Sequence, residues 1–203
     1  MKFLFTLIYK LFIFTLASVA TAIAAAILSI VLIFASKNIL YTSFVTYENP
    51  VNRGHSGYGI SDRDLIKDIS EWEEKNESPS IYRIHKKALE ITSKKLSFSL
   101  SASSSMDAMY KSEKANCVGY SRLYCSAFNS ITKELGVREQ YNCSHMVAEI
   151  HLMNYNLHDL FTSRSLKNHD FNVIKDSKGK IVLATDPSLY DYSYISAANI
   201  VEK

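Results

Sequence analysis

This 203-residue chain lacks charged residues over a long stretch near its start. The 26 residues from Leu11 to Ser36 include no Lys, Arg, Asp or Glu, and about 20 apolar residues are enough to cross a bilayer as a helix. Ala20-Thr21-Ala22 resembles a signal-peptide cleavage site, but cleavage there would leave an apolar stub, and the apolar core of an ordinary signal peptide has only about 7–15 residues. We therefore expect an uncleaved transmembrane anchor over residues 1–37.

The rest of the chain has no net charge. All 20 acidic residues and all but three of the 23 basic residues follow Lys37, so the two signs balance there. A balanced domain has no basic field to attract nucleic acid, which excludes a nucleic-acid partner. The length is ample for one domain with its own core. We expect a turn-rich linker over residues 38–60 and the domain over residues 61–203.

The charges beside the apolar run indicate how the anchor is oriented. Lys2 and Lys10 precede the run, while Lys37 and Arg53 follow it. The amino terminus tips this balance towards an orientation with the N-terminus in the cytoplasm. The sequence therefore predicts a single-pass membrane protein whose domain lies outside the cytoplasm.

Cysteine is scarce and odd in number, since Cys117, Cys125 and Cys143 are the three cysteines of the chain. In an oxidising compartment an odd number leaves at least one thiol unpaired within the chain, and such a thiol is a candidate reactive group. The sequence leaves open whether Cys125 and Cys143 form a disulfide.

No familiar metal-ligand spacing connects the histidines. His145, His151 and His158, with Cys143 and Asp159 nearby, suggest zinc by composition. Their spacings of six and seven residues fit no common ligand pattern. We therefore expect no metal, and we expect these histidines to be ordinary polar side chains on strands and loops.

Apolar residues at helical spacing predict two helices early in the domain. One begins at Ser61, and the next begins at Ser78-Pro79, where Ser can cap and Pro fits the first turn. The serine-rich segment Ser97–Ser105 is predicted as a short strand or a loop. Val137–Leu152 is predicted as a strand with a bulge or break, because its alternation is imperfect.

A third helix that starts at Asn116 would place Cys117 at its first position. Apolar and aromatic residues follow at helical spacing, Asn116 is a good N-cap, and Gly136 suits a left-handed helix end. The unpaired N–H groups and the positive dipole end would favour a thiolate at Cys117. A start at Ser112 is the alternative, and it would bury Cys117 a turn deeper as an inert core thiol.

The segments His169–Lys175 and Lys180–Asp186 are β-branched or aromatic runs that flank Asp-Ser-Lys-Gly, and they predict an antiparallel hairpin. If the two residues that flank this turn face each other, His169 lies opposite Asp186, and the carboxylate can orient the imidazole. A one-residue error in register would move Asp186 to the other face. The alternative is a surface hairpin in which both side chains are solvated.

The order of a helix-borne Cys, a strand-borne His and a later Asp resembles the transglutaminase-like superfamily, a papain-like group. Its motifs are a Cys followed three residues later by an aromatic and a small residue, a Gly-hydrophobic pair, a His with a nearby aromatic, and Asp-Pro-Ser or Asp-Pro-Thr. The matching residues here are Cys117, Tyr120, Ser121, Gly136, Val137, His169, Phe171 and Asp186-Pro187-Ser188.

The chain departs from that pattern at three positions. Ala115 stands where Gly is frequent, Asp170 replaces a small residue, and Phe171 replaces the usual Trp. These departures concern the substrate cleft and the oxyanion site, and they leave the three triad residue types in place.

The resemblance implies an α+β fold: a papain-like or transglutaminase-like core with helices packed on an antiparallel sheet, preceded by the transmembrane helix. It implies a membrane-anchored thiol enzyme, an amidase, protease or acyltransferase, that acts on protein or peptide amide bonds by hydrolysis or transamidation. Cys117 would be the nucleophile, His169 the base, and Asp186 the group that orients it. No cofactor is implied, and calcium is not, because no acidic loop of the EF-hand type is present.

The alternative is a non-catalytic module of the same fold that binds a peptide or a partner protein at the membrane.

Overall fold

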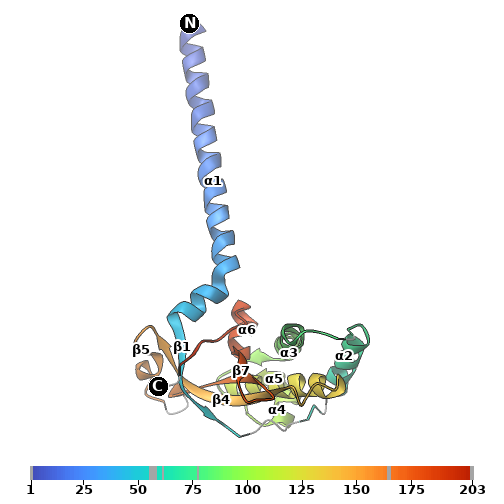
Figure 1. The fold of residues 1–203 in the computed structure, drawn as a ribbon. Coiled ribbons are helices and arrows are strands. Elements are labelled where there is room, and N and C mark those ends of the chain that lie inside the picture. The colour runs from blue at the N-terminus through green and yellow to red at the C-terminus, as the bar shows by residue number, and fades with distance from the viewer. Residues whose placement is uncertain (1, 55–58, 61, 77, 164–165, 202–203) are drawn as a thin grey trace. The chain divides into compact units, whose positions relative to one another are not determined.

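The computed structural model describes residues 2–54, 59–60, 62–76, 78–163 and 166–201 (Figure 1). The chain divides into two compact units, Met1–Leu40 and Tyr41–Lys203.

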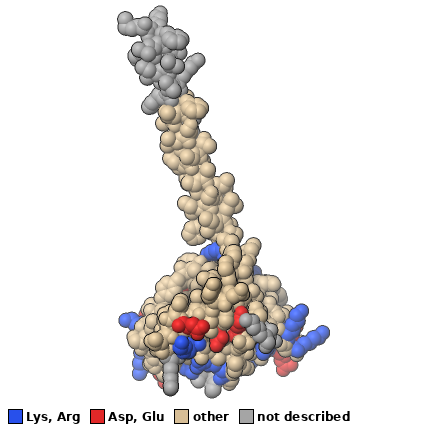
Figure 2. Space-filling view, turned by 90° about the vertical axis from the view of Figure 1, so that its left-hand side faces the viewer, with Lys and Arg blue, Asp and Glu red and all other residues tan. Residues whose placement is uncertain are grey.

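The first unit consists of one helix. Helix α1 spans Lys2–Phe44, so the anchor expected over residues 1–37 continues as helix for a further seven residues. Its segment Ile13–Phe44 reaches a mean hydropathy of 2.6 and is long and apolar enough to cross a membrane. In Figure 2 the tan stretch of the helix, below its grey end, shows no acidic or basic side chain. The α1 residues from Tyr41 onward belong to the second unit.

The second unit has a mixed α+β fold. The strands of its larger sheet are β1 (Val45–Asn52), β4 (Tyr141–Leu152), β5 (Tyr155–Asn156), β6 (His169–Asp176), β7 (Ile181–Thr185) and β8 (Ile200–Val201). They run in the order β7-β6-β4-β1-β8, and β5 also pairs with β4. Neighbours are antiparallel except β1 and β8, which are parallel.

Helices and a second, small sheet complete the unit. The helices are α2 (Arg63–Glu74), α3 (Ile81–Lys95), α4 (Met106–Ser112), α5 (Cys117–Glu134), α6 (Pro187–Ser193) and the 3-10 helix η1 (Leu157–Leu160). A second, small sheet pairs β2 (Ser97–Phe98) with β3 (Lys114–Ala115) in parallel.

The two early helices exist, and each starts slightly later than expected. Asp62 caps α2, because its carboxylate accepts hydrogen bonds from the backbone N–H groups of Asp64 and Leu65. Ser80 takes the N-cap position of α3. The expected cap Ser61 lies outside the described residues.

The segment 38–60, expected as a linker, contributes a strand instead. β1 lies inside the sheet between β4 and β8, because Val45 and Tyr47 are buried in its core. The turn-forming pair Asn49-Pro50 does not end the strand. Asn49 takes a left-handed φ of 51°, and the register with β4 shifts beside it, so the turn residues make a bulge.

Helix α5 is the centre of the main core and lies against β4, β6 and α3 (Figure 1). Tyr120, Tyr124, Phe128 and Ile131 are fully buried, as the helical spacing predicts. Each such side chain stabilises the fold by roughly 1.5–3 kcal/mol relative to an exposed one. Gly136 follows the helix with a φ of 69°, which confirms the predicted left-handed ending.

Candidate functional site

Cys117 is the first residue of α5, as predicted from its capping residue. The side chain of Asn116 accepts a hydrogen bond from the Gly119 N–H at 3.3 Å. The alternative start at Ser112 is wrong, because α4 ends there and Glu113 takes a left-handed φ of 54° before an extended β3. Cys117 therefore lies where the first N–H groups of a helix lack intrahelical partners.

His169 and Asp186 form a close pair. The Nε2 atom of His169 at the start of β6 lies 2.6 Å from Oδ2 of Asp186, which caps α6 just after β7. The same oxygen accepts a hydrogen bond from the Tyr47 hydroxyl at 2.8 Å. The other oxygen accepts from the backbone N–H groups of Ser188 and Leu189. Both oxygens of the carboxylate are therefore fixed.

The hairpin that carries this pair has a different register from the expected one. Lys175 pairs with Ile181, not with Lys180, and beyond a bulge the register is displaced by two residues. Asp176 still belongs to the strand, because its N–H donates to the Lys180 carbonyl oxygen at 2.9 Å, so the loop has three residues and not four. Its side chain accepts hydrogen bonds from two N–H groups of this turn, including that of Lys180. A displacement of two keeps every side chain on its expected face, so the His–Asp contact forms.

Charge stabilises the pair. Burial alone lowers the pKa of His169, but the charge of Asp186 and its hydrogen bond outweigh burial, and the pKa is raised well above its usual value. Burial raises the pKa of Asp186, while the imidazolium and the hydrogen bonds of Ser188 and Tyr47 bring it down to about 2. The two groups therefore form an imidazolium–carboxylate ion pair at neutral pH.

Cys117 lies on the other side of the imidazole. Its side chain hydrogen bonds to His169 and adds to the rise of the histidine pKa. Because Nε2 of His169 faces Asp186, Nδ1 is the ring nitrogen left to face the thiol. The thiol is partly exposed and is not part of a disulfide. The structure thus brings together the three residues predicted from the sequence.

A cavity of about 600 Å³ opens beside the thiol and the imidazole. This volume is typical of sites that bind small molecules or single side chains, about 300–1,000 Å³. Cys117 and His169 line it together with Arg53 and Asp170. Much of the remaining wall is apolar and includes Phe98, Leu100, Ile150, Leu157 and Phe161. A ligand that packs against this apolar wall would lie next to the thiol.

Asp170 contacts the thiol, although the sequence alone indicates no role for it in the site. The thiol donates towards its Oδ2 at 3.8 Å, and its Oδ1 lies 2.8 Å from Arg53 Nε and 2.6 Å from His145 Nε2. Alternation along β6 could have indicated where Asp170 points. Neighbouring side chains of a strand point to opposite faces, so Asp170 lies on the α5 face of the sheet when His169 lies on the other face. A buried carboxylate there requires partners. Those partners lie far away in sequence, which hides them.

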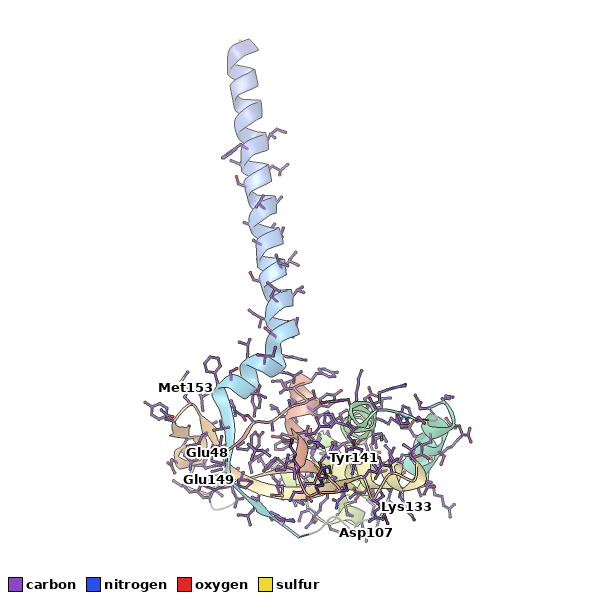
Figure 3. The ribbon with its side chains drawn as sticks, viewed as in Figure 1. Glu48, Asp107, Lys133, Tyr141, Glu149 and Met153 are labelled. Atoms are coloured by element: carbon purple, nitrogen blue, oxygen red, sulfur yellow. A yellow bond between two sulfur atoms is a disulfide. The ribbon has the colours of Figure 1, made fainter. Side chains whose placement is uncertain are left out.

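The other two histidines of the zinc hypothesis lie apart from this cluster. His151 on β4 lies 3.5 Å from both Glu48 and Glu149, which face each other across β1 and β4 (Figure 3). His158 in η1 contacts the carbonyl oxygen of Leu166 through Nδ1 at 2.6 Å. In the part of the chain that the structure describes, no three His, Cys, Asp or Glu side chains are grouped to hold a metal.

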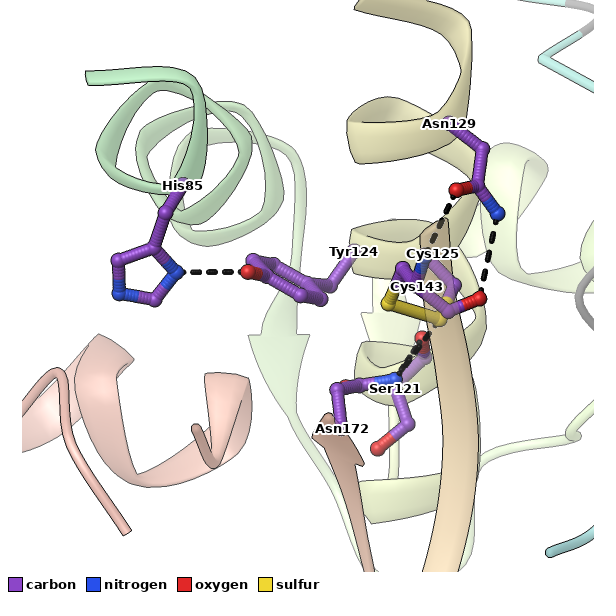
Figure 4. Close-up of a disulfide and its surroundings, with 7 residues drawn as sticks. All are labelled: His85, Ser121, Tyr124, Cys125, Asn129, Cys143 and Asn172. Atoms are coloured by element: carbon purple, nitrogen blue, oxygen red, sulfur yellow. Dashed lines mark hydrogen bonds between the residues drawn. A yellow bond between two sulfur atoms is a disulfide. The ribbon is translucent and has the colours of Figure 1, made fainter. Parts of the chain in front are cut away.

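A disulfide fixes the cysteine helix to the sheet. Cys125 of α5 is bonded to Cys143 of β4 (Figure 4). Asn129 accepts from the backbone N–H of Cys143 and donates to its carbonyl oxygen, and Asn172 of β6 donates to the carbonyl oxygen of Ser121. The bond answers the question the sequence left open and rigidly connects the two elements behind Cys117.

No protein-family model, curated protein or solved structure matches this chain. Any function must therefore be argued from the site itself. A thiol, an imidazole and a carboxylate in this order can generate a thiolate, position it, and return a proton to a leaving group. The site requires neither a metal nor a cofactor for that chemistry.

Proposed function

We propose that this protein is a membrane-anchored thiol enzyme of transglutaminase-like type that acts on protein or peptide amide bonds by acyl transfer. One observation carries the proposal. The imidazole of His169 lies between the Asp186 carboxylate, 2.6 Å from its Nε2 atom, and the thiol of Cys117 at the wall of a cavity. Nucleophilic thiol catalysis needs this chain of a nucleophile, a base and an orienting group.

The first half of the reaction forms a thioester. The proton of Cys117 resides on His169, and the resulting thiolate attacks the carbonyl carbon of the substrate amide. The tetrahedral intermediate collapses as the imidazolium gives its proton to the leaving amine, which breaks the carbon–nitrogen bond. The acyl group remains on Cys117, and His169 is now neutral.

The second half releases the acyl group. Neutral His169 removes a proton from a water molecule or a second amine, which attacks the thioester carbon. The carbon–sulfur bond breaks, and the cycle returns to the Cys117 thiolate beside a protonated His169. Water gives hydrolysis and an amine gives transamidation.

Asp186 serves this cycle as a positioning residue. Its hydrogen bond to Nε2 fixes the ring so that Nδ1 faces the thiol. Its second oxygen is held by the first turn of α6, so the carboxylate cannot rotate away. The tetrahedral oxyanion requires N–H donors. The backbone N–H of Cys117, at the start of α5, supplies one of them.

The placement of the domain follows from two features. Helix α1 supplies the anchor, because it is long and apolar enough to span the bilayer. The Cys125–Cys143 disulfide favours an oxidising compartment, since disulfides persist outside the cytoplasm. We therefore place the domain on the extracytoplasmic side, in agreement with an N-terminus in the cytoplasm.

The direct experiment is to trap the acyl-enzyme. A peptide-based electrophile, with the reactive group in place of the scissile amide, is incubated with the full-length protein in detergent, and the modified residue is identified by mass spectrometry. We expect modification of Cys117 in the wild type and its loss in His169→Ala. A Cys117→Ala variant controls for labelling elsewhere. Equal labelling of the wild type and His169→Ala would contradict the proposal.

A further inference from the structure

A second charged pair lies at the cavity wall beside Cys117. Asp170 Oδ1 lies 2.8 Å from Arg53 Nε in an ion pair, and the other oxygen of Asp170 faces the Cys117 sulfur at 3.8 Å. The Asp170 side chain is only 2% exposed, whereas that of Arg53 is 38% exposed. The carboxylate is therefore the inner member of the pair, and the guanidinium is the member that a ligand in the cavity meets.

We propose that Arg53 binds a carboxylate of the substrate, so that the enzyme selects acyl donors with an anionic group close to the scissile amide. This inference rests on the proposed function, because it concerns the substrate that Cys117 attacks. A guanidinium has five N–H donors in a planar fork that matches a carboxylate, and Arg53 contacts Asp170 through its Nε.

Asp170 positions the guanidinium for this role. It is buried, and it is held a second time by His145, whose Nε2 lies 2.6 Å from the same oxygen and whose side chain is 1% exposed. The backbone adds to this, since the Arg53 N–H donates to the His145 carbonyl oxygen at 3.0 Å. An arginine anchored at both its backbone and its Nε loses little conformational freedom when it binds a ligand.

The rest of the cavity favours a ligand with one anionic group on an apolar body. Phe98, Leu100, Ile150 and Phe161 form apolar parts of the wall. Arg53 is the only Lys or Arg among the described residues that line the cavity. An apolar surrounding strengthens a charged hydrogen bond, because water competes less for it.

Two small probes test this selectivity directly. Iodoacetate and iodoacetamide have the same reacting carbon and leaving group and differ in the negative charge. We measure the second-order rate constant of each with Cys117 in the full-length protein by mass spectrometry and take their ratio, so that the intrinsic reactivity of the thiol cancels. We expect the ratio of iodoacetate to iodoacetamide to fall about tenfold or more in Arg53→Met, as for loss of a charged hydrogen bond. Arg138→Met, which removes an exposed arginine outside the cavity, should keep the wild-type ratio.

A double variant separates ligand binding from charge balance. If Arg53 binds the anion, Arg53→Met together with Asp170→Asn keeps the low ratio. If Arg53 only offsets the charge of Asp170 beside the sulfur, removing both charges restores the wild-type ratio, and the inference is overturned.

A measurement on the wild type does not depend on the variants folding. Hippurate, an apolar ring with a carboxylate, should slow the reaction of Cys117 with iodoacetamide, whereas its neutral amide should not. Equal effects of the two compounds would refute the anion site. Failure of the proposed function looks different, since Cys117 would then lack His169-dependent reactivity at acid pH whatever the ratio.

Discussion

His169 Nε2 and Asp186 Oδ2 lie 2.6 Å apart although 17 residues separate them in the chain. The same Asp186 oxygen accepts from Tyr47 at 2.8 Å, and the Tyr47 hydroxyl lies 3.0 Å from that of Tyr41. Three segments that are distant in sequence therefore fix the orientation of one imidazole. Several measurable properties of the protein should depend on this arrangement.

Replacing Asp186 by Asn should impair turnover more than thiol reactivity. Asn keeps the size of the side chain but loses the negative charge that holds the Nε2 proton of His169. The analogous change in a serine-protease triad costs about 10⁴ in rate, and we expect the same direction here. The turnover of a cleavable peptide amide by the variant is compared with the rate at which its Cys117 is alkylated. Unchanged turnover in Asp186→Asn would mean that the carboxylate does not orient the base.

Adding a methyl group at Gly119 should displace the start of α5. A Cβ there would lie 2.7 Å from the Ala115 Cβ and 3.3 Å from the Met109 sulfur. Alanine favours a helix over glycine by about 1 kcal/mol, but overpacking of a tight core costs about 1–3 kcal/mol, so we expect net destabilisation in urea unfolding and slower Cys117 alkylation. Gly119→Ala combined with Ala115→Gly removes the clashing atom and should recover both. No recovery would show that the crowding at Ala115 is not the cause.

The stability of the domain should depend on pH through the His169–Asp186 pair. The folded-state pKa of Asp186 is lowered to about 2, so its contribution is present above its unfolded value of about 4 and is lost as pH falls towards 2. The pKa of His169 is raised, so its contribution is complete below about 6.5 and is lost as pH rises through the folded value. The pair therefore contributes most between about pH 4 and 6.5.

Urea unfolding of the wild type and of the double variant His169→Ala/Asp186→Asn, each measured from pH 3 to 9, gives this contribution. The difference in unfolding free energy between the two proteins should be greatest inside that window. A difference that does not vary with pH would show that the two groups are not an ion pair.

Membrane attachment should depend on the apolar helix alone. Salt screens charges but does not release a spanning helix, so the full-length protein should leave membranes with detergent and not with high salt. A chain that begins at Asn38 keeps Tyr41 and its contact with Tyr47, and it should be soluble and folded. Release of the full-length protein by salt would contradict the spanning helix.

The parts of the site that the sequence predicts correctly are those set by local signals. The start of α5 follows from Asn116, whose capping bond lies within the same turn. The facing of His169 and Asp186 follows from strand alternation, which survives a displacement of two residues. The register itself was wrong, because Asp176 pairs with Lys180 and a bulge between Ile174 and Lys175 shifts the strands once more.

The parts that the sequence does not reveal depend on distant contacts. β1 looks like a linker, since Asn49-Pro50 favours a turn, yet burial of Tyr47 makes it a sheet strand. Asp170 looks like a departure from a family motif until Arg53 and His145 are seen around it. Such partners come from other segments of the chain, so no local pattern identifies them.

The central claim is that His169 activates Cys117. The most direct test is the rate of alkylation of Cys117 by iodoacetamide from pH 4 to 9 in the wild type, in His169→Ala and in the control His151→Ala. An ordinary cysteine thiol has a pKa of about 8.5. We predict that the wild type and His151→Ala stay reactive well below that pH, and that His169→Ala reacts only near it. If Cys117 of the wild type titrates like a free cysteine, or if His145→Ala has a larger effect than His169→Ala, the account is contradicted.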